Sequence, residues 1–248
     1  MVCITCTLSD EYLNPEVYDV EYGQYTADFP LFIDIKSRGS ALDLACGTGR
    51  LTIALANSGL KCIGLDASVP MLERARLKSK ELDIQYYEGD IRDFHFEESF
   101  DIITLTGNSF QTLLTLEDQK KLFSCVRSHL KTDGLFIFNT RNFRKQDLTT
   151  TQEFEHWHAF TDQDGHMVQV YGKQTYHPES STVLYLTKRV WPSHVTMTET
   201  TLRFTLVEEL ISLLEESGFE VIQLYGDLNK TPYQKESPAI IPLCRARV

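Results

Sequence analysis

The sequence predicts an α/β fold, a doubly wound and mostly parallel seven-stranded sheet that carries a small antiparallel β insertion. Three observations predict this class. Apolar runs and helical periodicity alternate from residue 41 to residue 139. A glycine-rich loop follows the first apolar run. Between residues 152 and 203 helical periodicity is absent, and Thr, Val, Tyr and Trp are frequent. The 248 residues, 42% of them apolar, are enough for one large core.

Local signals place each element of the first half. Short apolar runs predict strands at residues 41–45, 61–66, 84–87, 102–105 and 135–139. Helices are expected between them. One covers residues 51–56 with Gly59 as its C-cap, and one is capped by Ser68 and runs to about Glu81. Another opens at Thr115 with Asp118 and is ended by Gly134. This alternation requires right-handed crossovers and so predicts a parallel sheet.

The second half changes character and then returns. From about residue 150 to 203 we expect three or four antiparallel strands, with turns at residues 164–165, 177–178 and 192–193. A capping box of Thr205 and Glu208 then predicts a helix that Gly218 ends, followed by strands at residues 219–225 and 240–244. The antiparallel block is therefore an insertion within a single domain, residues 1–248. Pro242 cannot donate to a ladder, so we expect a bulge there.

Composition narrows the class of partner. The net charge of −11 and the lack of a basic cluster argue against nucleic acid. No apolar stretch reaches the ~20 residues of a membrane span, and the N-terminus does not resemble a secretory signal. Six scattered cysteines suit a reducing compartment, so we expect a cytoplasmic location. The expected assembly is a monomer or a homodimer. Cys3 and Cys6 lack a second pair at zinc-like spacing, so we expect free thiols and no metal.

The stretch "LDLACGTGR", residues 42–50, predicts a ligand site at the end of the first strand. In open α/β sheets ligands bind beyond the carboxyl ends of the strands. Gly47 and Gly49 lack a Cβ, so the chain can turn tightly and a ligand can touch the backbone. Asp66 ends the second strand and can accept hydrogen bonds from both hydroxyls of a ribose. Both NAD and S-adenosylmethionine (SAM) fit these residues.

Three details favour SAM. Position 52 is Thr, where a dinucleotide loop has its third glycine. Asp43 would repel a pyrophosphate, whereas SAM carries an amino group and a sulfonium. Asp90 ends the third strand and can accept from an adenine amino group.

The segments "LDLACGTGR", "GLDAS", "GDIRDF" and "FDIITLTGNSF" resemble successive motifs of the class I SAM-dependent methyltransferases. The resemblance covers residues 15 to 142 and resumes at the last helix and two strands. It implies an N-terminal helical lid (1–38), a SAM-binding core (39–142 and 204–248) and a seventh strand between the fifth and sixth. The cofactor contacts that it implies are Ala45, Cys46, Gly47, Gly49 and Asn108 around the methionine part, Asp66 on the ribose, Asp90 on the adenine amino group, and Ala67, Met71 and Ile91 around the adenine ring. We expect Cys46 to contact the ligand through its backbone rather than to act as a nucleophile.

Tyr18, Tyr22 and Tyr25 share one face of an N-terminal helix. The stripe is interpreted either as packing or as part of a lid over SAM, with Tyr18 as the first contact. The insertion resembles those of glycine N-methyltransferases and sugar N,N-dimethyltransferases, which implies that it roofs the acceptor site. The candidates for that site are Tyr18, Tyr22, Arg141, Asn142, His156, His158, Tyr171, Tyr185 and Trp191.

"HWH" at residues 156–158 should place both histidines on one strand face, in substrate-facing, packing or metal-binding roles. No carboxylate cluster beside them supports a metal.

The sequence therefore predicts a SAM-dependent methyltransferase that acts on N or O of a small molecule. No catalytic triad is found, and a neutral amine needs no general base at the moment of attack. The alternatives are an NAD-linked oxidoreductase, a SAM- or S-adenosylhomocysteine-binding protein without catalysis, and an RNA or protein methyltransferase, which the charge disfavours.

Overall fold

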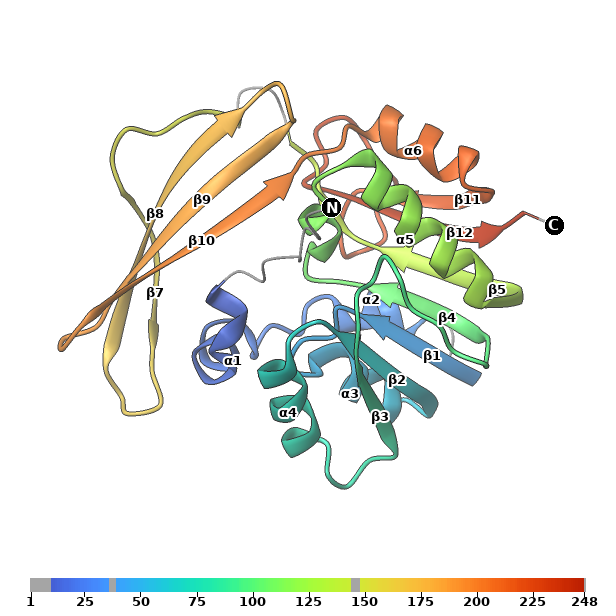
Figure 1. Cartoon of the computed structure of the whole chain (residues 1–248), viewed down its shortest axis with the longest axis horizontal. Coiled ribbons are helices and arrows are strands. Elements are labelled where there is room, and N and C mark those ends of the chain that lie inside the picture. The colour runs from blue at the N-terminus through green and yellow to red at the C-terminus, as the bar shows by residue number, and fades with distance from the viewer. Residues whose placement is uncertain (1–9, 36–38, 144–147, 248) are drawn as a thin grey trace, which may run out of the picture.

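A computed structural model describes residues 10–35, 39–143 and 148–247 of the chain. A central sheet has the order β11-β12-β5-β4-β1-β2-β3, and a separate antiparallel sheet has the order β10-β9-β8-β7 (Figure 1). The strands of the central sheet are β1 (Gly39–Leu44), β2 (Leu60–Asp66), β3 (Ile84–Glu88), β4 (Phe100–Leu105), β5 (Leu130–Phe138), β11 (Phe219–Tyr225) and β12 (Ala239–Ala246), with the short β6 (Thr140–Arg141) paired to β12. β1 to β5 pair in parallel, while β12 runs antiparallel to both neighbours. The predicted fold class is confirmed, and the last strand lies between the fifth and the sixth.

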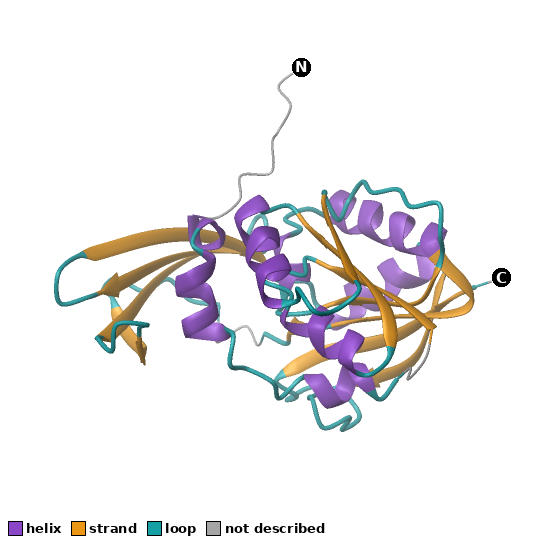
Figure 2. Cartoon of the chain, turned by 90° about the horizontal axis from the view of Figure 1, so that it is seen from below, coloured by secondary structure: helices purple, strands orange, loops and turns teal. Residues whose placement is uncertain are grey.

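Helices cover both faces of the central sheet (Figure 2). Their bounds are α1 (Pro15–Tyr22), α2 (Phe29–Ile33), α3 (Arg50–Asn57), α4 (Val69–Lys78), α5 (Leu116–His129) and α6 (Val207–Glu216), with short 3-10 helices at Asp10–Leu13 and Ser109–Thr112. Apolar side chains of α5 and α6 pack with Leu42 and Leu44 on one face. Those of α2 and α3 pack with Ala41 on the other face. Alternate residues of β1 thus supply two separate cores, as expected for a strand covered on both faces.

The insertion forms four antiparallel strands, β7 (Glu155–Thr161), β8 (Met167–His177), β9 (Thr182–Val190) and β10 (Val195–Arg203). Its three hairpins fall at the predicted turns. The sheet stands away from the central sheet, and α1 lies between the two (Figure 1). A small core that includes Val183, Leu202 and Phe204 joins it to the rest of the molecule. This arrangement leaves one face of the insertion directed toward α1 and the central sheet.

Several local predictions need correction. α5 ends at His129, not at Gly134, because Leu130 already has extended dihedrals and begins β5. Thr205 does not cap α6, since the N-cap is Leu206 and the Thr205 hydroxyl accepts a hydrogen bond from Gln119 (2.8 Å). α4 ends at Lys78, three residues before the expected Glu81.

Two further local predictions, on capping and on the tyrosine stripe, had different outcomes. Ser68 and Thr115 do cap their helices, accepting from the backbone N–H groups of Met71 and Asp118. Tyr25 does not share the helical face of Tyr18, because α1 stops at Tyr22.

Pro242 lies inside the central sheet, at the point where β12 changes its partner on one side. β12 pairs with β6 up to Ile240 and with β5 from Leu243, so Pro242 occupies the interruption between the two partners. On its other side the register with β11 shifts between Val221 and Gln223. The bulge that we expected at Pro242 is absent there, because Pro242 pairs in register with Leu224 and the register shift lies opposite Leu243 and Cys244.

Candidate functional site

The glycine loop has two glycines with different surroundings. Gly47 (φ +55°) and Gly49 (φ +78°) both have left-handed backbones. A Cβ on Gly47 would meet nothing within 4 Å, so the backbone there borders open space. A Cβ on Gly49 would lie 2.7 Å from the Tyr86 hydroxyl. Gly47 therefore leaves room for a ligand, whereas Gly49 is required by packing against β3.

Asp66 lies where the resemblance places a ribose-binding acid. Its carboxylate accepts from the backbone N–H groups of Gly47 (2.7 Å) and Ser68 (2.8 Å), which fixes it beside the glycine loop. Burial raises the pKa of Asp66, and those backbone donors oppose part of the rise. Each carboxylate oxygen has a second lone pair, so the group can still accept from ligand hydroxyls.

Asp43 is buried within β1 behind the loop. Its two oxygens accept from the hydroxyls of Thr52 (2.6 Å) and Thr104 (2.8 Å). Burial raises the pKa of Asp43 to about 6 despite these donors. A carboxyl group at this place is a poor neighbour for a pyrophosphate and a tolerable one for a cation.

Asp90 is paired with a cation. Arg92 donates to both of its carboxylate oxygens and also forms an ion pair with Asp118 (3.1 Å). Burial would raise the pKa of Asp90, but the hydrogen bonds from Arg92 outweigh burial and lower it. Asp90 therefore remains an ionised acceptor at the end of β3. Sequence reasoning did not foresee that Arg92 would hold it.

The remaining adenine candidates differ in accessibility. Ala67 is exposed and Ile91 half-buried, so both offer surface to a ligand. Met71 is 1% exposed and belongs to the protein interior. Ala45, with φ +50°, is half-buried in the glycine loop.

Cys46 is buried, and burial together with the charges of Asp43 and Asp66 raises the pKa of its thiol well above its usual value. The thiol stays protonated, which argues against a nucleophile.

Two asparagines meet at the carboxyl edge beyond β4 and β5. Asn108 has a left-handed backbone (φ +60°), and its side chain accepts from the Asn139 amide (2.9 Å). The side-chain carbonyl oxygen of Asn139, Oδ1, is buried, and no described residue donates a hydrogen bond to it. Asn139 was not among the sequence candidates, although "LFIFN" ends the fifth strand. The pair leaves an unsatisfied acceptor at the edge where a ligand is expected.

α1 is fastened over the glycine loop by Asp19. The Asp19 carboxylate accepts from Thr48 (2.6 Å), Arg74 (2.7 Å) and Lys78 (2.8 Å). Burial would raise its pKa, but these hydrogen bonds outweigh burial and lower it. In the next segment Arg50 pairs with both oxygens of Asp28 at 2.6 Å. Neither carboxylate was a sequence candidate, because their partners lie 22 to 59 residues away.

The other side of α1 is fastened to the insertion. The Glu21 carboxylate is fully buried and accepts from Arg189 (2.7 Å) on β9. His158 Nε2 on β7 lies 2.9 Å from the other Glu21 oxygen. Beside this contact is a cavity of about 250 Å³, whose lining includes Tyr18, Tyr22 and Trp191. The tyrosines thus lie where α1 meets the insertion.

The insertion candidates divide between its two faces. Strand pairing places His158, Val170 and Arg189 in one row of the face toward α1, which we call the inward face. His156 and Tyr171 pair on the opposite face, where His156 contacts Gln169 (2.9 Å). The expectation that both histidines share a face is wrong, because the register shifts between them.

Arg141 and Asn142 also differ. The Asn142 side chain donates to the backbone carbonyls of Lys235 (3.1 Å) and Ser237 (2.7 Å). It therefore holds the segment before β12 against the chain that follows β6. Arg141 is exposed on β6, and its charge opposes the rise that burial causes in the Tyr185 pKa. No carboxylate of the described residues forms an ion pair with Arg141.

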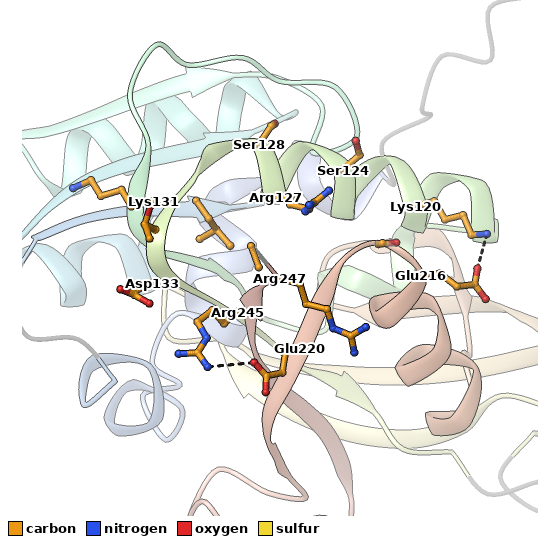
Figure 3. Close-up of a pocket in the computed structure, with 14 residues that line it drawn as sticks. Lys120, Ser124, Arg127, Ser128, Lys131, Asp133, Glu216, Glu220, Arg245 and Arg247 are labelled. Atoms are coloured by element: carbon orange, nitrogen blue, oxygen red, sulfur yellow. Dashed lines mark hydrogen bonds and ion pairs between the residues drawn. The ribbon is translucent and has the colours of Figure 1, made fainter.

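A larger cavity lies elsewhere. It measures about 1000 Å³ and is bordered by the start of β5, the end of β12 and the ends of α5 and α6 (Figure 3). This is the edge opposite the glycine loop. Charges that line it pair with one another, as in Lys120–Glu216 (3.1 Å) and Arg245–Glu220 (3.2 Å). This cavity is therefore not part of the candidate site, because it lies at the opposite edge of the sheet and its lining charges are already paired.

Comparisons with known proteins agree with this geometry. Residues 41–134 match the model of a methyltransferase domain. A glycine/sarcosine N-methyltransferase of Aphanothece halophytica is 30% identical over 216 residues, covering 82% of this chain and 75% of that protein. A cypemycin N-terminal methyltransferase of Streptomyces sp is 37% identical, but over only 38% of this chain and 39% of that protein. A solved SAM-dependent methyltransferase of Clostridium acetobutylicum ATCC 824 superposes with a TM-score of 0.78 at 22% identity, covering 94% and 97% of the two chains.

The chain belongs to the class I SAM-dependent methyltransferase family, and its cofactor is SAM. This membership sets aside the NAD-linked alternative. The residues present fit the group, because Gly47 leaves open space beside the Asp66 carboxylate, which can still accept from ribose hydroxyls. None of the described helices is long and apolar enough to cross a membrane.

The C-x-x-C of Cys3 and Cys6 lies outside the described residues. The four described cysteines are free thiols.

Proposed function

We propose that this protein transfers a methyl group from SAM to a nitrogen atom of a small-molecule amine. The observation that carries the proposal is the enclosure of the carboxyl edge. α1 is tied to the core by Asp19 and to the insertion by Glu21, so the helix and the inward face of the insertion cover the same edge. A covered edge suits a small acceptor and excludes water from the reacting atoms.

The proposed cofactor contacts follow from the described geometry. Gly47 gives the ligand access to the backbone, Asp66 accepts from ribose hydroxyls and Asp90 from the adenine amino group. Asn108 lies toward the methionine part, next to the free carbonyl of Asn139. Ala67 and Ile91 offer exposed surface to the adenine ring. Met71 would support that surface from beneath.

SAM, when bound, supplies an electrophilic methyl carbon, and the acceptor nitrogen forms a bond to this carbon as the carbon–sulfur bond breaks and sulfur keeps the electron pair. The methylated nitrogen is then an ammonium group, and it releases its proton to bulk water after the product leaves the site. The chain's own task is then to align the acceptor and to keep the site dry. Nitrogen is favoured over oxygen because a neutral amine attacks without a general base. Two relatives are also named as N-methyltransferases, of glycine and sarcosine in one case and of glycine, sarcosine and dimethylglycine in the other.

Two measurements test this proposal. Calorimetry should show that the purified protein binds SAM and S-adenosylhomocysteine but not NADH. Methyl-labelled SAM should then label phenethylamine or L-phenylalanine more than phenethyl alcohol, a matched oxygen acceptor. Labelling of the alcohol alone would contradict transfer to nitrogen. Tight SAM binding with no transfer to any amine in a metabolite extract would instead favour a SAM-binding protein without catalysis.

A further inference from the structure

Trp157 is an exposed aromatic side chain on the inward face of the insertion. The register of β7 against β8 shifts between His156 and His158, so Trp157 is the extra residue of a bulge. A bulge redirects the side chain it carries. Trp157 lies against Gly172, because a Cβ built there would be 1.7 Å from the indole. Its side chain remains 41% exposed, so one side of the ring system faces open space.

Gly172 is the residue that permits this position. It pairs with Thr187 in the middle of the sheet, and its φ angle is not in the left-handed region. Another residue would therefore suit its backbone, but any Cβ would collide with the Trp157 ring. The combination of a bulge and a glycine holds one indole flat against the sheet. Exposed tryptophans with a fixed pose are a common feature of binding sites.

The position of Trp157 on the inward face is informative. One end of this face contacts α1 through Arg189, and the other end joins the core around Val183. Gly172 and Tyr185 lie in the rows between them. The Trp157 and Tyr185 rings meet edge to face, with centroids 6.0 Å apart. The two aromatic rings thus occupy the part of the insertion that spans from the lid helix to the carboxyl edge.

Arg141 adds a charge at the end of this aromatic pair. Arg141 lies in β6, two residues before Phe143, and Phe143 packs in the same apolar cluster as Tyr185. Other arginines of this acidic protein hold carboxylates, among them Arg50, Arg92 and Arg189. Within the described part of the chain Arg141 has no such partner. An exposed guanidinium next to an aromatic wall can take a carboxylate or another anionic group.

We propose that Trp157 and Tyr185 form the apolar wall of the acceptor site and that Arg141 binds an anionic group of the acceptor. This inference depends on the proposed function and specifies its substrate class. The acceptor is an amine that carries an apolar ring or chain together with an anionic group. An acceptor as small as glycine would leave the wall uncovered and would gain little from it.

The test compares four variants with three probes, and the fourth variant, Arg141→Gln, addresses the anionic group. Trp157→Ala removes the wall, Gly172→Ala displaces the indole without deleting it, and Met167→Ala removes an exposed apolar side chain from the outward face of β8 as a control. The probes are L-phenylalanine, phenethylamine and glycine, and their methylation is followed as S-adenosylhomocysteine formed. Calorimetry with protein saturated by S-adenosylhomocysteine measures binding of the same probes independently of turnover.

For both Trp157→Ala and Gly172→Ala we expect KM and Kd for L-phenylalanine to rise about tenfold or more, with a small change for glycine. Met167→Ala should behave as the unmodified protein. Arg141→Gln should weaken the binding of L-phenylalanine about tenfold. The binding of phenethylamine, which lacks the carboxylate, should be nearly unchanged.

Failure has two distinguishable forms. If the unmodified protein binds neither SAM nor S-adenosylhomocysteine, the proposed function is wrong. If the cofactor binds normally, the inference is overturned by absent binding of both aromatic probes, or by equal affinities in the Trp157 variant and the control. If Arg141→Gln weakened the binding of both aromatic probes equally, the proposal that Arg141 binds an anionic group of the acceptor would be wrong.

Discussion

At the scale of single residues, the two loop glycines allow a direct contrast. Gly47→Ala should abolish most of the affinity for SAM, because the new methyl group enters the space that a ligand would occupy. Gly49→Ala should instead lower the stability of the fold, since its methyl group meets the Tyr86 hydroxyl at 2.7 Å. Both changes also carry the cost of a left-handed backbone, about 1 kcal/mol.

Calorimetry with SAM and urea unfolding of the two variants check this contrast. Equal loss of stability with equal SAM affinity in both variants would contradict the roles assigned to the two glycines.

Asp43 predicts a pH dependence of stability. Its folded pKa of about 6 lies above the unfolded value of 3.8, so protonation favours the folded state. Its contribution is fully present below about pH 4 and is lost as the pH rises through 6, by roughly 3 kcal/mol in total. Asp43→Asn cannot ionise and should avoid this loss. The difference in unfolding free energy between the variant and the unmodified protein should therefore shift in favour of the variant between pH 4 and 6, and then level off.

Urea unfolding of both proteins at each pH measures that difference and cancels the titration of other groups. A difference that stays constant over this range would show that Asp43 is ionised in the folded protein at an ordinary pKa.

At the scale of elements, α1 joins the core to the insertion through carboxylates on two sides. Arg189→Met should destabilise the fold by about 3–5 kcal/mol, because it leaves the fully buried Glu21 charge without its main partner. The double variant Glu21→Leu with Arg189→Met removes both charges and should recover most of that loss. Denaturant unfolding of the single and double variants completes the cycle. A double variant as unstable as Arg189→Met alone would show that the pair is not the source of the effect.

Elements were also the scale at which the sequence predicted most. The strand at residues 219–225 has its predicted bounds, and the insertion turns fall where Gly and Pro signals placed them. These signals are local, so a single chain segment carries them. The end of α5 was misplaced because Gly134 resembles a C-cap, whereas the chain enters β5 at Leu130.

At the scale of the whole molecule, the candidate site combines residues that sequence spacing could indicate with others that it could not. The glycine loop, Asp66 and Asp90 lie at strand ends, and position along an α/β chain is enough to predict them. Glu21 and Arg189 are 168 residues apart, and nothing in either segment indicates the pairing. The bulge at Trp157 depends on the register of β7 against β8, which "HWH" alone does not specify. Long-range pairing decided these features.

The central claim is that SAM binds at the carboxyl edge with its ribose on Asp66. Its most direct test is calorimetric titration of S-adenosylhomocysteine into the unmodified protein, Asp66→Ala and the exposed control Asp83→Asn. We predict binding to the unmodified protein and the control with the same affinity, and a loss of about a hundredfold or more for Asp66→Ala. Equal affinity in all three proteins would contradict the account.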